Sequence, residues 1–239
     1  VNNLRSTIDM LSRYRGLPTN AWLEEIISNL EYRFGIKPNS ENLISFEQND
    51  QLKGLENLSG LIDAVMNHTT LSVHYKTYKG VEFIHTIYPY YIKEYNNRWF
   101  LFGMGEEVGD VENLALDRIV EYSISNKSFK PNVTTDFSTY FDDVIGVSKP
   151  KSDVKVENIK LRFTDNRFPY VLSKPLHHTQ TIVEGESNTI QIEVRPTREL
   201  DQIIFSFIPD IEVLSPDWYR ASITEKIKEN LEKYSSMKV

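Results

Sequence analysis

The sequence predicts an α+β protein in which a small, strongly curved β-sheet or barrel is followed by a ferredoxin-like α/β domain. From Thr70 to Ser125, apolar and polar residues alternate in five runs separated by short turns, a pattern typical of small barrels. From residue 154 onward, the expected elements follow the order β-α-β-β-α-β, which is characteristic of the split βαβ fold. The 239 residues are sufficient for one large domain or two small ones.

The first part of the chain shows helical periodicity. Residues 1–35 place apolar side chains three and four positions apart, as one face of a helix requires. We expect residues 36–56 to form a connection with one short strand near Leu43–Phe46, and a helix to follow from Leu58 to Asn67. Residues 1–57 are therefore predicted to be a helical linker region.

The predicted barrel domain spans residues 58–125 and contains five strands. Pro89 is expected to interrupt the alternation, because proline lacks the N–H group that a strand donates. Asn96 and Asn97 both tolerate the positive φ that a type I′ hairpin turn requires. The predicted strands are LSVHYKTY (71–78), VEFIHTIY (81–88), YYIKEY (90–95), RWFLFGM (98–104) and VENLALDRIVEYSIS (111–125).

A two-residue turn at Asn96-Asn97 fixes the register of the hairpin around it. The predicted pairs are Tyr95 with Arg98, Glu94 with Trp99, Lys93 with Phe100, Ile92 with Leu101 and Tyr91 with Phe102. Directly opposed residues share a face, so Tyr90, Ile92, Trp99 and Leu101 are expected to face the core.

The opposite face of this hairpin is alternately aromatic and cationic. Such a face suits stacked bases and phosphates, but ordinary cross-strand aromatic pairs give the same pattern. A register slip of one residue would exchange the two faces. The residues on this face are Tyr91, Lys93, Tyr95, Arg98, Phe100 and Phe102.

The second half of the chain alternates between strands and helices. Residues 126–153 are predicted to be a linker with a short helix near Phe137–Ile145, and residues 154–239 to be the ferredoxin-like domain. The expected elements are a strand at Val154–Phe163, a short helix near Phe168–Ser173, strands at His177–Val183 and Thr189–Arg195, a helix at Glu199–Phe207, a strand at Ile211–Leu214 and a final helix after Pro216.

Composition argues against several functional classes. A formal net charge of −7 disfavours a protein that binds duplex DNA along its whole surface. The absence of cysteine excludes disulfides, thiolate catalysis and Cys-based zinc sites. No catalytic, cofactor or metal motif is recognisable in the sequence, so we expect a protein that is not an enzyme.

The sequence also bears on location. No run approaches the roughly 18 apolar residues of a membrane span, and no signal peptide is visible, so we expect a cytoplasmic protein. Because the chain begins with Val1 and not with Met, we expect that further residues precede it in a longer protein.

The segment from about Leu61 to Ser123 resembles the WYL domain of bacterial transcriptional regulators. The resemblance rests on LIDAVMNHTTLSVHYKTYKG, HTIYPYYIKEYNNRWFLFGM and LALDRIVEY. The Trp-Tyr-Leu that names the family appears here as Trp99-Phe100-Leu101, and an arginine of the family, sometimes a histidine, corresponds to His85. The Asp-Arg-Ile motif of the family corresponds to Asp117-Arg118-Ile119, and its early strand tyrosine to Tyr75.

The resemblance extends to most of the chain. Residues 154–235 resemble the C-terminal extension called WCX, and residues 1–60 resemble the helical linker that follows a winged helix-turn-helix in this family. It implies a Sm-like five-stranded barrel that senses a nucleic-acid-like or nucleotide-like ligand and controls a DNA-binding domain. The implied ligand-binding residues are Tyr75, His85, Arg98, Trp99, Phe100 and Arg118.

Among these residues, Arg118 carries the strongest expectation, because a planar fork of donors suits phosphate recognition. Its alternative role is a buried structural pair with Asp117 or another acid. His85 supplies less charge than an arginine at neutral pH, so it implies a less anionic ligand or a pH-dependent affinity. Trp99 is expected to contribute to core packing more than to ligand contact.

The leading hypothesis is therefore the effector-binding and dimerising part of a bacterial regulator. Its partners would be a single-stranded nucleic acid or nucleotide-like effector, a second copy of the chain, and operator DNA bound through a winged helix-turn-helix that is not in this chain. No cofactor, metal or membrane partner is expected. The alternative is a nucleic-acid-binding or protein-interaction module without a role in transcription.

Overall fold

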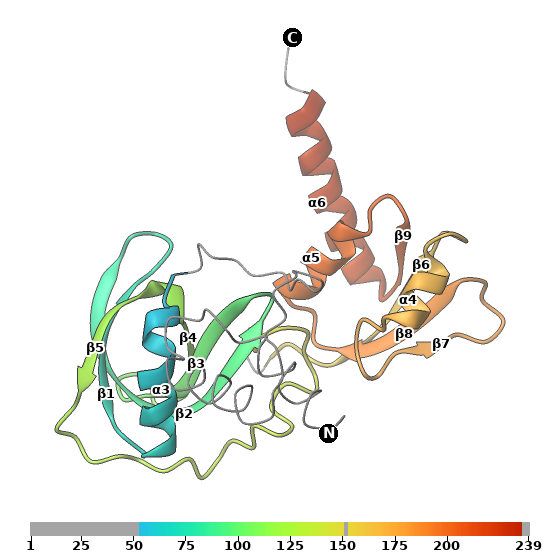
Figure 1. The fold of residues 1–239 in the computed structure, drawn as a ribbon. Helices are drawn as coiled ribbons and strands as arrows, with labels where there is room; N and C mark the ends of the chain where they lie inside the picture. Colours follow the sequence, from blue (N-terminus) through green and yellow to red (C-terminus); the bar gives the residue numbers. More distant parts are fainter. Residues whose placement is uncertain (1–52, 151–152, 236–239) are drawn as a thin grey trace, which may run out of the picture. The chain divides into compact units, whose positions relative to one another are not determined.

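The structure, a computed structural model, describes residues 53–150 and 153–235. The chain divides into two compact units at Thr134 and Thr135. Each unit combines helices with an antiparallel sheet, in agreement with the predicted α+β class (Figure 1). The helices predicted in residues 1–35 and the strand predicted near Leu43–Phe46 lie outside the described residues.

The first unit is a five-stranded antiparallel sheet packed against one helix. Its strand order is β4-β3-β2-β1-β5, and among the described residues β4 and β5 do not pair with each other. The sheet therefore has two ends in its hydrogen-bonding pattern. The elements are η1 (Leu55–Asn57), α3 (Leu58–Met66), β1 (Leu71–Lys76), β2 (Glu82–Tyr95), β3 (Arg98–Gly105), β4 (Val111–Ala115), η2 (Leu116–Arg118) and β5 (Ile119–Ile124).

Helix α3 covers the inner face of this sheet and agrees with the predicted helix at Leu58–Asn67. Leu58, Leu61 and Ala64 recur every three residues, so they lie on one side of the helix and are buried. They form one core with sheet residues that include Val73 and Leu101.

The predicted strands exist, but two of their boundaries are wrong. β2 continues through Pro89, which lies beside a register shift between Pro89 and Tyr91. The bulge leaves an extra residue in β2, so the missing proline N–H does not end the strand. The predicted final strand at 111–125 is divided by the 3₁₀ turn η2, so Asp117 and Arg118 lie in a turn and not within a strand.

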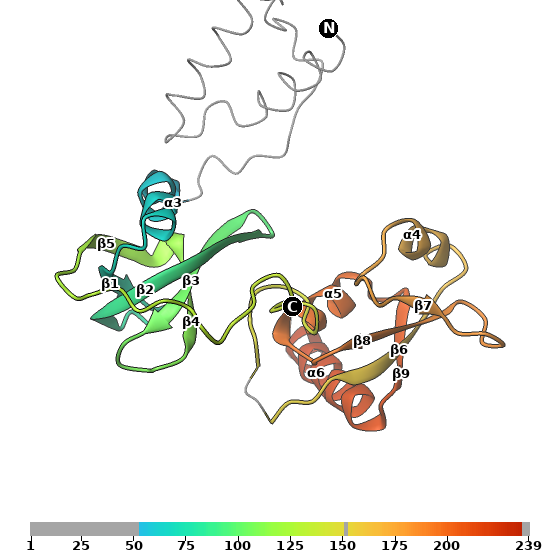
Figure 2. The same ribbon diagram turned by 90° about the horizontal axis from the view of Figure 1, so that it is seen from below.

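The β2–β3 hairpin has the predicted register in all five pairs. Asn96 and Asn97 have φ of 51° and 59°, as a type I′ turn requires. This hairpin extends beyond the other strands of the unit (Figure 2). Leu101 on the predicted core face is fully buried, but Phe100 and Phe102 on the opposite face are also buried, at 8% and 1% exposure. The two phenylalanines of the expected aromatic and cationic face are therefore covered, whereas Tyr91 on the same face is exposed.

The second unit contains a four-stranded antiparallel sheet in the order β7-β8-β6-β9. Helices α4, α5 and α6 contribute Val171, Leu200, Ile204, Tyr219 and Ile223 to one hydrophobic core with this sheet. The last turns of α6 extend beyond the sheet of this unit (Figure 1). The elements are β6 (Glu157–Phe163), α4 (Phe168–Ser173), β7 (Thr181–Ile182), β8 (Thr189–Val194), α5 (Arg198–Ser206), β9 (Ile211–Ser215) and α6 (Asp217–Ser235).

Two predictions in this unit are corrected. The strand expected at His177–Val183 is only two residues long, at Thr181–Ile182. The segment Phe137–Ile145 forms turns and no helix. Its backbone hydrogen bonds join residues three apart, and Asp143 binds Arg195, which anchors the segment to the end of β8 instead of letting a helix continue.

Candidate functional site

The predicted site residues occupy the first unit, where β1 and β2 bring aromatic rings together. Tyr75 pairs with Phe83, and Val73 pairs with His85, so these side chains share the inner face of the sheet. The ring centres of Tyr75 and Phe83 are 5.8 Å apart, and those of Phe83 and His85 are 5.2 Å apart. Phe83 is the most open of the three, at 38% exposure. A continuous row of rings therefore joins two predicted site residues.

Tyr75 anchors this row to β4. Its side chain is buried, and its hydroxyl oxygen accepts a hydrogen bond of 3.3 Å from the backbone N–H of Ala115. Burial raises the pKa of the Tyr75 hydroxyl, which the neighbouring Arg118 partly opposes. Tyr75 therefore contributes a neutral ring, and not a charge, to the site.

Arg118 lies at the end of the row, in the η2 turn. Its guanidinium carbon is 5.7 Å from the centre of the Tyr75 ring and 3.6 Å from the centre of the Tyr78 ring. Its Nε is buried and has no hydrogen-bond partner. Gly54 lies directly against this turn, because a Cβ added there would be 2.3 Å from the carbonyl carbon of Leu116. The close approach holds η2, and therefore Arg118, in place.

Arg98 is the second arginine of the site, and it forms the acid pair that was considered for Arg118. Its Nη2 donates to both carboxylate oxygens of Asp117, at 2.8 and 2.6 Å. Its Nη1 donates to the Tyr78 hydroxyl at 2.5 Å. Asp117, the acid named in the alternative role of Arg118, thus binds Arg98, and Arg118 makes its close contact with an aromatic ring.

Tyr78 connects the two arginines, and sequence reasoning missed it. It lies in the turn between β1 and β2 and is 72% exposed, yet its ring contacts Arg118 and its hydroxyl contacts Arg98. The signal available in the sequence was its place at the end of the first alternating run, directly before Lys79-Gly80.

His85 lies at the other end of the ring row, beside an acid that the sequence analysis did not select. Its Nδ1 is 3.6 Å from Oε2 of Glu112. The Nε2 of His85 and the Oε2 of Glu112 are both buried without a hydrogen-bond partner. Burial raises the pKa of the Glu112 carboxyl, His85 opposes this, and the negative charges of Glu107 and Asp110 add to it.

The other two predicted site residues, Trp99 and Phe100, pack on opposite faces of β3. Trp99 packs against the hydrophobic core of the unit with Ile92, as expected for a core contribution. Phe100 is buried on the other face of β3, where the guanidinium of Arg98 lies 5.8 Å from the centre of its ring. Of the six predicted residues, Tyr75, His85, Arg98 and Arg118 form one network through Phe83 and Tyr78. We call this set the arginine–tyrosine network.

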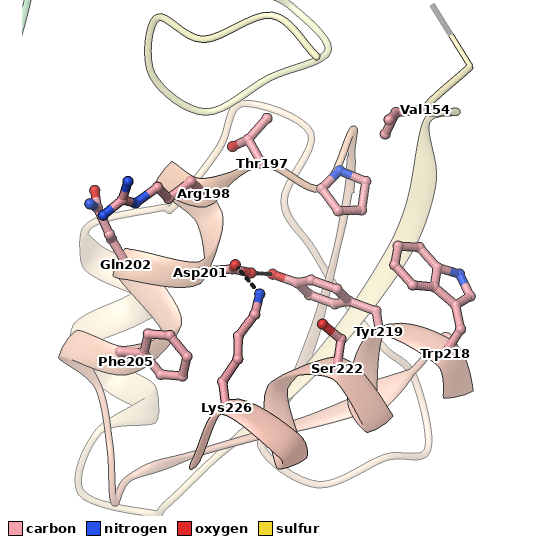
Figure 3. Close-up of a pocket in the computed structure, with 11 residues that line it drawn as sticks. Val154, Thr197, Arg198, Asp201, Gln202, Phe205, Trp218, Tyr219, Ser222 and Lys226 are labelled. Atoms are coloured by element: carbon pink, nitrogen blue, oxygen red, sulfur yellow. Dashed lines mark hydrogen bonds and ion pairs between the residues drawn. The ribbon is translucent and has the colours of Figure 1, made fainter. Parts of the chain in front are cut away.

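The second unit contains a separate hollow of about 670 Å³ between α5 and α6 (Figure 3). At its floor, Asp201 accepts hydrogen bonds from the Tyr219 hydroxyl at 2.8 Å and from Lys226 Nζ at 2.5 Å. Burial raises the pKa of the Tyr219 hydroxyl, and the bond to Asp201 adds to this. The central polar groups of this hollow are therefore paired with one another. The arginine–tyrosine network, in contrast, contains buried polar atoms without partners.

Neither a metal cluster nor a membrane span is present in the part of the chain that the structure describes. Among residues 53–150 and 153–235, no three His, Asp or Glu side chains are placed to hold a metal ion. Within the same residues, no helix has the length and apolar character needed to cross a bilayer.

Comparison with protein families finds two matches. The WYL domain family matches residues 56–124, which contain the arginine–tyrosine network. The WCX domain family matches residues 155–231, which contain the second sheet and its helices. No curated protein matches the chain.

Two solved structures are similar to the chain at low sequence identity. Proteasome accessory factor B/C (PafBC) of Arthrobacter aurescens is 15% identical, with a TM-score of 0.34, over 98% of this chain and 36% of that one. A CRISPR Cas-related protein is 14% identical, with a TM-score of 0.48, over 76% of this chain and 52% of that one. The chain thus spans about a third of the first protein and about half of the second.

Proposed function

We propose that this chain, which carries a WYL domain and a WCX domain, is the effector-binding and dimerising part of a bacterial transcriptional regulator. The observation that carries the proposal is the arginine–tyrosine network within the WYL domain. It joins two guanidinium groups to a row of aromatic rings. We further propose that the protein acts in the cytoplasm and is not an enzyme.

The proposed effector is a single-stranded nucleic acid or a nucleotide-like molecule. Aromatic side chains stack on bases without needing a particular sequence, and arginine forks bind phosphates. Arg118 has a buried Nε without a hydrogen-bond partner, so the protein itself does not use all the donors of this guanidinium. The ring row from Tyr75 to His85 offers contact with a base.

The proposed architecture is a Sm-like barrel followed by a ferredoxin-like domain. The order β4-β3-β2-β1-β5 and the long strand β2 support the first assignment, because β2 pairs with β1 at one end and with β3 at the other. The element order β6-α4-β7-β8-α5-β9 and the all-antiparallel pairing support the second.

Regulation would require that the effector favour one arrangement of the attached DNA-binding domains over another. In the proposal, operator DNA is bound by a winged helix-turn-helix domain attached to this chain. This part is tested with the full-length protein on its own promoter. DNA binding that is unchanged by every substitution in the arginine–tyrosine network would contradict it.

The homodimer is a further part of the proposal. In the last turns of α6, Ile227, Leu231 and Tyr234 lie on one side of the helix and are 41%, 63% and 74% exposed. An apolar stripe of this kind is commonly covered by a partner. We expect Leu231→Glu to weaken self-association in sedimentation experiments, and Glu229→Lys on the opposite side to leave it unchanged.

Effector binding is tested by fluorescence anisotropy with a labelled single-stranded oligonucleotide at low and moderate salt. We expect binding that weakens with salt and is lost in Arg118→Ala. Arg220→Ala is the matched control, because Arg220 pairs with Glu212 on the surface of the other unit. Binding that is unaffected by Arg118→Ala would contradict the assigned site.

A further inference from the structure

We infer that the His85–Glu112 pair makes the site prefer guanine among the bases of a single-stranded ligand. This inference rests on the nucleic-acid effector proposed above and assigns a specificity role to Glu112, a residue outside the predicted set.

The first observation is that both partners have unsatisfied polar atoms. The His85 side chain is only 8% exposed, and its Nε2 has no hydrogen-bond partner. The Glu112 Oε2, 3.6 Å from His85 Nδ1, also has none. Buried polar groups are nearly always hydrogen-bonded in folded proteins. The fold therefore leaves this polar pair, which lies next to a row of aromatic rings, with hydrogen-bonding capacity that the protein itself does not use.

The second observation is that the backbone makes room for the carboxylate. Gly105 lies on β3 against Glu112, and a Cβ added there would be 1.9 Å from Oε2. A glycine inside a strand commonly marks such a close approach. Any side chain at position 105 would displace the carboxylate, so the glycine leaves the space that Glu112 occupies beside His85.

The third observation is that the pair can be reached from a stacking surface. The Glu112 side chain is 26% exposed, so it is not closed off from a ligand. Phe83 is 38% exposed, and its ring meets His85 edge to face at 5.2 Å between centres. A base packed on Phe83 would have its edge near the carboxylate.

The charges at the two ends of the network differ in sign. Arg98 and Arg118 lie at one end. At the other end, Glu112 lies beside the His85 imidazole and near the carboxylates of Glu107 and Asp110. Phosphates therefore belong at the arginine end, and the acidic end favours a group that donates hydrogen bonds.

Guanine meets this requirement better than the other bases. An ionised carboxylate only accepts hydrogen bonds. The Watson–Crick edge of guanine carries two adjacent donors, N1–H and the N2 amino group. Adenine and cytosine place an acceptor next to their donor, and thymine places acceptors on both sides of its single donor. Those acceptors would face the carboxylate and repel it.

The experiment measures anisotropy at pH 8 with labelled thymidine decamers that carry two central guanines, adenines or hypoxanthines. We expect the guanine decamer to bind about tenfold more tightly than the adenine decamer, with hypoxanthine between them because it lacks the N2 amino group. Glu112→Gln should remove the preference. Glu107→Gln, which removes the same charge nearby, should retain it.

The outcomes separate this inference from the proposed function. Equal binding of the three decamers, or a guanine preference that persists in Glu112→Gln, overturns the inference and leaves the nucleic-acid effector standing. No binding of any decamer overturns both. The hypoxanthine comparison needs no substitution in the protein, so equal binding of the guanine and hypoxanthine decamers overturns the inference even where Glu112→Gln impairs folding.

Discussion

The guanidinium carbon of Arg118 lies 3.6 Å from the centre of the Tyr78 ring, the distance of a closely stacked cation–π contact. The hydroxyl of the same tyrosine accepts a hydrogen bond from Arg98. Tyr78 thus offers the two arginines an aromatic face and an oxygen acceptor, which are the groups that a nucleotide would offer. Because Tyr78 is 72% exposed and lies in a turn, it is positioned as a displaceable substitute for the ligand.

Replacing Tyr78 tests this relationship. We expect Tyr78→Ala to bind a single-stranded oligonucleotide about threefold to tenfold more tightly, because an exposed cation–π contact and one hydrogen bond no longer compete with the ligand. Tyr78→Phe, which keeps the ring, should lie between the two. Anisotropy titrations measure the effect.

The control for this substitution is Tyr170→Ala. Tyr170 is 45% exposed and contacts Arg167 at 5.6 Å in the other unit, so its loss should not change binding. Weaker binding of Tyr78→Ala would mean instead that Tyr78 stacks on the ligand.

The Arg98–Asp117 pair links the hairpin to the η2 turn. We expect Asp117→Asn to lower the free energy of unfolding by about 1 kcal/mol, because two charge-assisted bonds between partly buried groups are weakened. Urea unfolding measures this. In Glu212→Gln, the corresponding change at the exposed pairs with Arg220 and Arg162 should be within about 0.5 kcal/mol of zero. Equal losses of unfolding free energy in the two variants would show that the partly buried Arg98–Asp117 pair stabilises the protein no more than an exposed pair does.

The hairpin register was predictable because a two-residue turn leaves little freedom. Positive φ at Asn96 and Asn97 fixes the pairing of every residue from Tyr91 to Phe102. Local alternation could not reveal that β2 passes Pro89 at a bulge, because the bulge depends on the partner strand. The same limitation hid the break at Leu116–Arg118, where the turn packs closely against Gly54, a residue distant in sequence.

The candidate site was predictable only where the family resemblance supplied residues. Tyr75, His85, Arg98 and Arg118 do form one network, but Tyr78 joins it and Glu112 adjoins it through contacts between strands and turns. Glu112 pairs with Gly103 across β3 and β4, a relationship that sequence spacing alone does not give. Trp99 and Phe100 were selected from the family motif; Trp99 packs against the hydrophobic core, and the buried Phe100 ring lies 5.8 Å from the guanidinium of Arg98.

Gly54 tests whether the η2 turn positions Arg118. Its φ is +87°, and an added Cβ would be 2.3 Å from the carbonyl carbon of Leu116. We expect Gly54→Ala to destabilise the protein by about 2 kcal/mol or more and to weaken oligonucleotide binding. Gly80→Ala is the matched control, because Gly80 has a φ of +78° with nothing within 4 Å, so it should cost only about 1 kcal/mol. Equal losses of stability in the two variants would contradict a packing role for Gly54.

Glu112 is expected to lower the free energy of unfolding at neutral pH, because its ionised carboxylate is partly buried in the site. Burial raises the pKa of its carboxyl above the ordinary value of 4.5, with Glu107 and Asp110 adding to this and His85 opposing it. The folded state therefore holds the proton more tightly than the unfolded state. The stability that Glu112 contributes is full below pH 4.5 and is lost as the pH rises through the folded-state pKa.

Glu112→Gln removes this titration. We expect the variant to be more stable than the wild type at pH 8, by about 1 kcal/mol or less, and the difference to shrink as the pH falls toward 4. Thermal unfolding across this range measures it, with Glu107→Gln as the control for the loss of one charge. A variant that is less stable than the wild type at pH 8 would show that the contact with His85 outweighs the cost of burying the carboxylate. Glu112 would then be a structural residue, since a stabilising ion pair needs no ligand to explain its presence.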